Sequence, residues 1–78
     1  MEALVVKVSD SKKTMLVGIR RNKYQVGYEF GWVSNPDGLA KGAVINDFPE
    51  PKGTVQCADK EGNPIQYEDG APVVRFTF

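Results

Sequence analysis

The pattern of hydrophobic and polar residues is that of β-strands along almost the whole chain, with short β-branched or apolar runs and stretches in which the two kinds of residue alternate. No stretch keeps apolar residues at helical spacing for three turns. Clusters rich in Gly, Pro, Asn, Asp and Ser separate the alternating stretches and predict turns at 9–13, 34–38, 59–63 and 68–71. Strands are predicted at residues 3–8, 14–20, 24–33, 53–58, 64–67 and 72–78, with a short strand or a single helical turn inside 39–52.

The predicted strand 24–33 carries a large apolar or aromatic side chain at every second position. These side chains are Tyr24, Val26, Tyr28, Phe30 and Trp32. A strand would place all of them on one face of the sheet, and glycines would share the other face. Such a face can be packed core or exposed binding surface, and the pattern leaves this open for Phe30 and Trp32.

Short strands with frequent turns predict an all-β fold, namely a five- to six-stranded barrel that resembles an OB-fold. An SH3-like barrel is the alternative. The 78 residues suffice for a single domain, 1–78, with a small core, so a homodimer that buries further apolar surface is expected.

The composition excludes several classes of chemistry. The chain has no histidine and one cysteine, Cys57, so it lacks the usual zinc ligand sets, an internal disulfide and every His-dependent catalytic group. We therefore expect no enzyme, no cofactor and no metal. The free thiol fits a reducing compartment, and no apolar run is long enough for a signal peptide or a membrane span. A soluble, cytoplasmic protein is expected.

The formal net charge is zero, but the charges are unevenly distributed. Residues 1–24 hold six basic and two acidic side chains, a net charge of +4, whereas residues 25–78 hold four basic and eight acidic side chains, a net charge of −4. This asymmetry indicates an anionic partner for one face of the protein. The acidic residues lie mainly in turns, and their spacing matches no calcium-binding loop.

The basic residues of the first third lie in two turns that directly precede the aromatic stretch. They are Lys12, Lys13, Arg20, Arg21 and Lys23. Proteins that bind single-stranded nucleic acid without sequence preference combine two features: cations contact the phosphates, and aromatic rings stack on the bases. We therefore predict that these residues, with Tyr24 and Tyr28, bind single-stranded DNA, or RNA as an alternative.

The order of the segments resembles the small single-stranded-DNA-binding proteins of filamentous bacteriophages, the gene V protein type. The similarity consists of the basic turn Arg-Arg-Asn-Lys-Tyr at 20–24, the Pro-Lys-Gly-Thr-Val step at 51–55, and a late Gly-containing turn followed by a Pro-led strand at 69–78. The resemblance implies an OB-type barrel that dimerises and coats phage single-stranded DNA during replication, in the host cytoplasm.

The resemblance also implies residue roles. Arg20, Arg21 and Lys23 would contact phosphates, Tyr24 would stack on a base, and Val26 would supply an apolar contact. The late hairpin would form the dimer interface through Ile65 and Tyr67. A different function, a small protein-interaction module, is indicated by the neutral total charge and the acidic second half.

Overall fold

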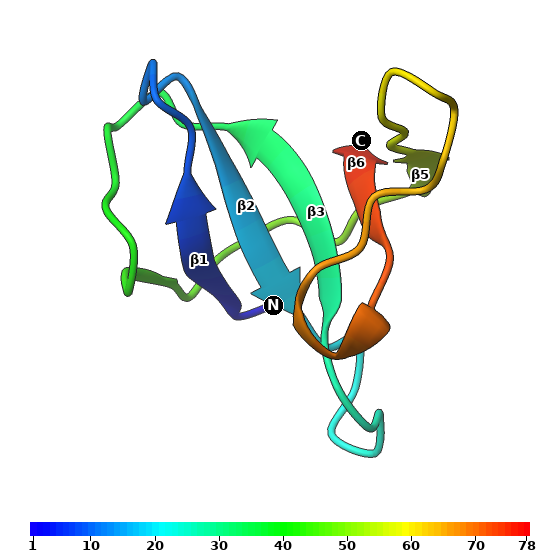
Figure 1. Ribbon diagram of the computed structural model, residues 1–78. Helices are drawn as coiled ribbons and strands as arrows, with labels where there is room; N and C mark the ends of the chain where they lie inside the picture. Colours follow the sequence, from blue (N-terminus) through cyan, green and yellow to red (C-terminus); the bar gives the residue numbers. More distant parts are fainter.

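The computed structural model describes residues 1–78, apart from the side chain of Asp69, and it is all-β as expected (Figure 1). The only helical element in this described chain is a short 3₁₀ turn, η1 (Glu68–Gly70), so no helix there is long and apolar enough to cross a membrane. The strands are β1 (Ala3–Val8), β2 (Thr14–Ile19), β3 (Glu29–Ser34), β4 (Val44–Ile45), β5 (Gly53–Gln56) and β6 (Val73–Thr77).

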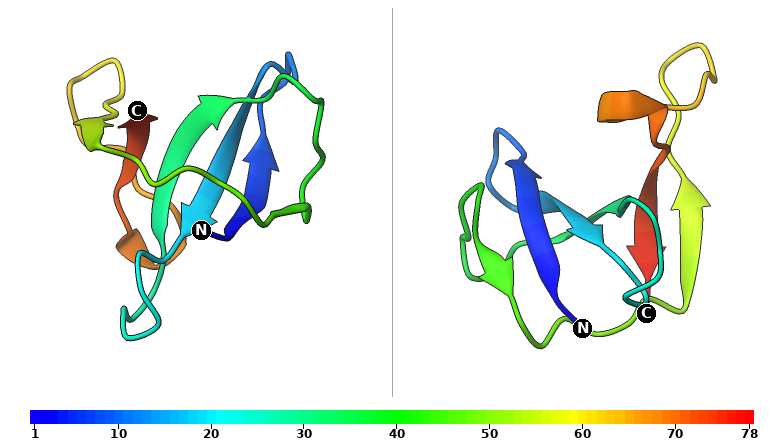
Figure 2. Two further views of the ribbon diagram at one scale, coloured as in Figure 1. Left: turned by 180° about the vertical axis from the view of Figure 1, so that it is seen from behind. Right: turned by 90° about the horizontal axis from the view of Figure 1, so that it is seen from below.

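The six strands form one mixed sheet in the order β4-β1-β2-β3-β6-β5. β1, β2 and β3 make an antiparallel meander, β6 lies parallel to β3, and β5 returns antiparallel to β6. The sheet curls, but its edge strands β4 and β5 do not pair, so the barrel-like fold stays open (Figure 2). An antiparallel meander with a later strand parallel to its third strand is the OB-type arrangement. The parallel β3–β6 pair therefore favours an OB-type fold over the SH3-like alternative, in which the strands are antiparallel.

The core lies on the inner face of this curled sheet. Alternate residues of β1 and β2 point into it, because successive side chains of a strand face opposite sides. The buried core cluster consists of Ala3, Val5, Met15, Val17, Ile19, Phe48 and Phe76. Leu16 and Val73 are also buried, but they belong to the opposite, outer face and lie outside this cluster.

Phe48 covers the side of the core that the open sheet leaves uncovered. It lies in the connection from β4 to β5, where its backbone exchanges two hydrogen bonds with Met1, both 2.9 Å long. Its ring contacts that of Phe78 edge-on, with centroids 5.8 Å apart. This connection therefore runs between the two unpaired edges of the sheet (Figure 2), and it adds the Phe48 ring to the core cluster.

A β-bulge in β1 changes which side chains face outward. Val5 pairs with Val17, but the next pair is Lys7 with Leu16, so Val6 has no partner in β2. Without the bulge, strict alternation would turn Lys7 toward the core with Val5. The extra residue instead places Lys7 on the outer face and brings Val8 against the core.

Two predicted strands differ from the structure. The strand expected at 24–33 begins only at Glu29, because Gly27 has a φ of +80°, which a β-strand cannot accommodate. Residues 20–28 therefore form a loop. The strand expected at 64–67 is reduced to two isolated bridges, from Pro64 to Ala58 and from Gln66 to Pro72.

Candidate nucleic-acid interface

The 20–28 loop is shaped by hydrogen bonds among its own residues. The Asn22 carboxamide oxygen accepts the backbone N–H of Tyr24 at 2.9 Å. The Arg21 N–H donates to Oε1 of Gln25 at 2.9 Å, and Nε2 of Gln25 donates to the Gly27 carbonyl at 3.3 Å. Side chains that bond to nearby backbone groups are typical of compact turns, so this loop has a defined shape.

The tip of the loop presents an apolar and cationic surface to solvent. Tyr24 is 80% exposed and Val26 is 99% exposed. The Lys23 ammonium lies 5.2 Å from the centroid of the Tyr24 ring, within the range of a cation–π contact. Lys23 and Tyr24 are thus brought together, and Val26 is accessible in the same loop. The role of these three residues in binding stays a prediction.

Arg20 and Tyr28 lie together at the base of the same loop. The Arg20 guanidinium carbon is 5.2 Å from the centroid of the Tyr28 ring, which is 44% exposed. A shallow hollow of about 210 Å³ lies beside them, lined also by Lys23 and Glu2. Glu2 is therefore an acidic side chain close to these predicted phosphate contacts.

Arg21 has a different environment from its neighbour Arg20. Its Nε donates to both carboxylate oxygens of Glu29, at 2.9 and 3.2 Å, and its Nη1 donates to the carbonyl of Pro51 at 3.1 Å. The Glu50 carboxylate lies 3.7 Å from the same Nη1. The guanidinium therefore connects the 20–28 loop to the start of β3 and to the segment before β5, and its charge is already paired.

Lys12 and Lys13 lie far from the other predicted cations. They occupy the β1–β2 turn, and the whole of β2 separates them from Arg20 (Figure 1). A strand of this length spans roughly 20 Å, so the two basic turns lie at opposite ends of the sheet. Neighbouring positions in the sequence thus do not produce one continuous basic site.

The outer face of the sheet holds a row of side chains that spans four strands. The register places Lys7 opposite Leu16, Leu16 opposite Trp32, and Trp32 opposite Arg75. Directly opposite residues share a face and lie about 5 Å apart, so this row has a cation at each end and the indole between them. Lys7 and Arg75 are exposed, and Trp32 is half-buried.

Aromatic rings continue from this row toward the base of the 20–28 loop. Tyr28 and Phe30 have centroids 6.2 Å apart, and Phe30 and Tyr67 have centroids 4.6 Å apart. Gly18 lies opposite Phe30, and a Cβ at this glycine would come within 3.1 Å of the Phe30 ring. The absence of a side chain at 18 thus lets the ring lie close to β2.

Phe30 and Trp32 are accordingly outer-face residues and not part of the core cluster. The sequence pattern correctly placed Tyr28, Phe30 and Trp32 on one side of the chain, but it could not tell which side faces solvent. Lys7 was missed as a candidate binding residue, and the sequence pattern did not place Arg75 beside Trp32. A bulge determines the direction of Lys7, and Arg75 reaches Trp32 only through the non-sequential β3–β6 pairing.

The residues predicted for a dimer interface lie next to this outer face. Tyr67 packs on Phe30 of its own chain. Ile65 is 39% exposed and lines, with Val55, Trp32 and Arg75, a hollow of about 370 Å³. The predicted role of Ile65 and Tyr67 in a dimer stays a prediction.

Among the described side chains, no group of three or more His, Cys, Asp or Glu residues could hold a metal ion. Comparison with known proteins gives no further assignment, since no protein-family model, curated protein or solved structure matches the chain.

Proposed function

We propose that this protein binds single-stranded DNA without strong sequence preference, across the outer face of β1, β2, β3 and β6 and along the 20–28 loop. The observation that carries the proposal is the row in which Trp32 lies between Lys7 and Arg75. Sequence-tolerant binding has two parts: cations neutralise the phosphates, and aromatic rings stack on the bases. The 20–28 loop and its base extend the same combination through Arg20, Lys23, Tyr24 and Tyr28. The OB-type arrangement also supports the proposal, because OB-folds bind oligonucleotides on the corresponding face.

Trp32 is the only tryptophan of the chain, so its fluorescence reports directly on the proposed surface. Titration with oligothymidine at low salt is expected to quench the emission, and added salt is expected to restore it as counterions compete for the phosphates. Duplex DNA of the same length serves as the control ligand, because its bases are not available for stacking. If the emission and the elution volume stay unchanged with oligothymidine at low salt, the proposal is wrong.

Two substitutions separate specific contacts from the general effect of charge. Arg75→Gln is expected to weaken binding, whereas Lys41→Gln removes the same charge from the connection between β3 and β4 and is expected to have a small effect. Trp32→Ala is expected to reduce affinity about 5- to 150-fold, which corresponds to 1–3 kcal/mol for the loss of one stacked base. Because Trp32→Ala removes the reporter, its affinity is measured by the polarisation of a labelled oligonucleotide.

Under the same proposal the protein acts as a homodimer that coats DNA, as in the phage proteins that it resembles. Light scattering during size-exclusion chromatography, with and without oligonucleotide, measures the mass directly. A monomer in both states would remove the dimer from the proposal and leave the binding surface unaffected.

One observation favours the alternative, a protein-interaction module. β5 is an edge strand, and its residues Thr54, Val55 and Gln56 are exposed. An extended peptide can add to such an edge. Arg20→Gln combined with Lys7→Gln distinguishes the two functions. Neither residue lies on β5 or on its neighbour β6, so the double substitution should impair DNA binding and leave a peptide bound at β5 unaffected.

A further inference from the structure

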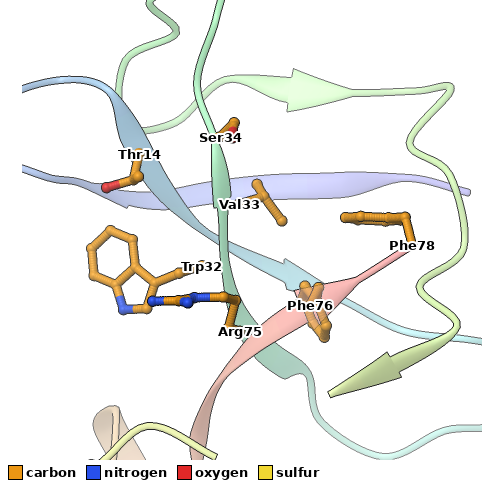
Figure 3. A pocket seen from close by; sticks show the side chains of 7 residues that line it. All are labelled: Thr14, Trp32, Val33, Ser34, Arg75, Phe76 and Phe78. Atoms are coloured by element: carbon orange, nitrogen blue, oxygen red, sulfur yellow. The ribbon is translucent and has the colours of Figure 1, made fainter. Parts of the chain in front are cut away.

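A recess opens where β3 and β6 separate. The two strands pair in parallel from Phe30–Val73 to Trp32–Arg75, and no pairing follows this point. The gap beyond forms a cavity of about 450 Å³. Because the strands diverge here, side chains of both sheet faces line the cavity, as Figure 3 shows.

The lining combines aromatic, polar and cationic groups. In Figure 3, Trp32 and Arg75 extend side by side at one flank, and the Phe78 ring lies at the other. Thr14 and Ser34 contribute hydroxyl groups, and none of the described residues that line the cavity is acidic. Flat apolar surface with a few polar groups is typical of small-molecule recognition, and the guanidinium favours an anionic group nearby.

We propose that this recess accepts one nucleobase of the bound strand, with the phosphate next to that base held by Arg75. This inference rests on the proposed function. Trp32 and Arg75 belong both to the outer-face row and to the cavity, so a strand on the outer face reaches the recess without leaving its cations. The flat ring of a base matches the aromatic flanks, and the attached phosphate matches Arg75.

The hydroxyl groups of Thr14 and Ser34 make the recess tolerant of base identity. A hydroxyl group can both donate and accept a hydrogen bond, so it can pair with either kind of group on the edge of a base. Both residues are exposed at the ends of their strands, which leaves the hydroxyls free to rotate. The recess therefore recognises the flat shape of a base and does not distinguish one base from another.

Ser34→Leu tests the recess, because the larger apolar side chain occupies part of it without removing a charge. Affinity for oligothymidine is expected to fall about 5- to 150-fold, the contribution of one stacked base. The salt dependence of binding should stay unchanged, since no phosphate contact is lost. Asn63→Leu, the matched control in the exposed turn at 59–63, should bind like the unmodified protein.

A second measurement uses the unmodified protein and thus does not depend on how Ser34→Leu folds. Oligothymidine that carries 5-bromodeoxyuridine is irradiated in the complex, and the cross-linked peptides are mapped. Cross-links to Phe78 as well as Trp32 are expected if a base enters the recess. Cross-links to Trp32 without Phe78, together with normal binding by Ser34→Leu, would overturn the inference and leave the proposed function intact. Absence of any DNA binding would overturn both.

Discussion

Arg20 and Arg21 are adjacent and carry the same charge, yet the structure predicts that their removal has different effects on DNA binding. The Arg20 guanidinium is exposed beside Tyr28, whereas that of Arg21 is bound to Glu29 and Pro51. We expect Arg20→Gln to lower the salt dependence of binding. Arg21→Gln is expected to leave that dependence unchanged and to weaken the attachment of the 20–28 loop.

The size of the difference follows from counterion release. For a single strand, each phosphate that is neutralised contributes about 0.7 to the slope of log affinity against log salt. A fourfold rise in salt thus reduces affinity about 2.6-fold for each contact, and Arg20→Gln should lower the slope by about 0.7. The Arg21 side chain is 30% exposed, so loss of its ion pair and hydrogen bonds should cost roughly 1–2 kcal/mol of folding stability.

The assay is a fluorescence titration of each variant with oligothymidine at several salt concentrations, alongside urea unfolding. Arg21→Gln combined with Glu29→Gln is the control, because it also removes the carboxylate that Arg21→Gln leaves unpaired. This double variant should recover part of the lost stability. If Arg21→Gln lowers the slope of log affinity against log salt as much as Arg20→Gln does, then Arg21 contacts a phosphate in the complex. The expectation that Arg21 only holds the 20–28 loop in place would then be wrong.

Three further predictions concern the packing and the charge of the same regions. Gly31→Ala places a Cβ within 2.7 Å of Cγ of the buried Phe76 ring, so it should destabilise the fold by about 1–3 kcal/mol in urea unfolding, with partial rescue by Phe76→Leu. Asn35→Ala removes three hydrogen bonds of a buried carboxamide and should lower the free energy of unfolding by about 2–4 kcal/mol. Asn63→Ala, at an exposed position, should lower it by about 0.5 kcal/mol or less. Glu2→Gln removes the acid beside Arg20 and should raise affinity for oligothymidine about 1.4- to 5-fold at low salt, with no gain at high salt.

The strand content was predictable because β1, β2 and β6 are rich in β-branched and apolar residues and turn-forming residues separate the predicted strands. The predicted strand 24–33 was wrong over its first half for a local reason. Gly27 adopts a positive φ, and Asn22 and Gln25 bond to the backbone of their own loop. Glycine is compatible with a bent strand and with a turn alike, so the alternation of large side chains alone could not separate the two.

The candidate site was harder to predict, because its residues meet through the topology of the sheet. Trp32 and Arg75 are far apart in the sequence and become neighbours only through the parallel pairing of β3 with β6. Conversely, Lys13 and Arg20 are close in the sequence and lie at opposite ends of β2. A local pattern of charges and aromatic residues identifies the kinds of side chain, whereas their distances depend on which strands become neighbours.

A neutral protein can still offer a cationic surface, because the placement of each charge matters more than the total. Glu29 is paired with Arg21, and the Asp59 carboxylate accepts two backbone N–H groups within its own turn. Lys7 and Arg75 stay on the outer face on either side of Trp32, and Lys7 reaches this position only because of the bulge at Val6. One unpaired residue in β1 therefore changes the charge of the outer face without any change in composition. The net charge of the chain thus constrains the partner less than the register of its strands does.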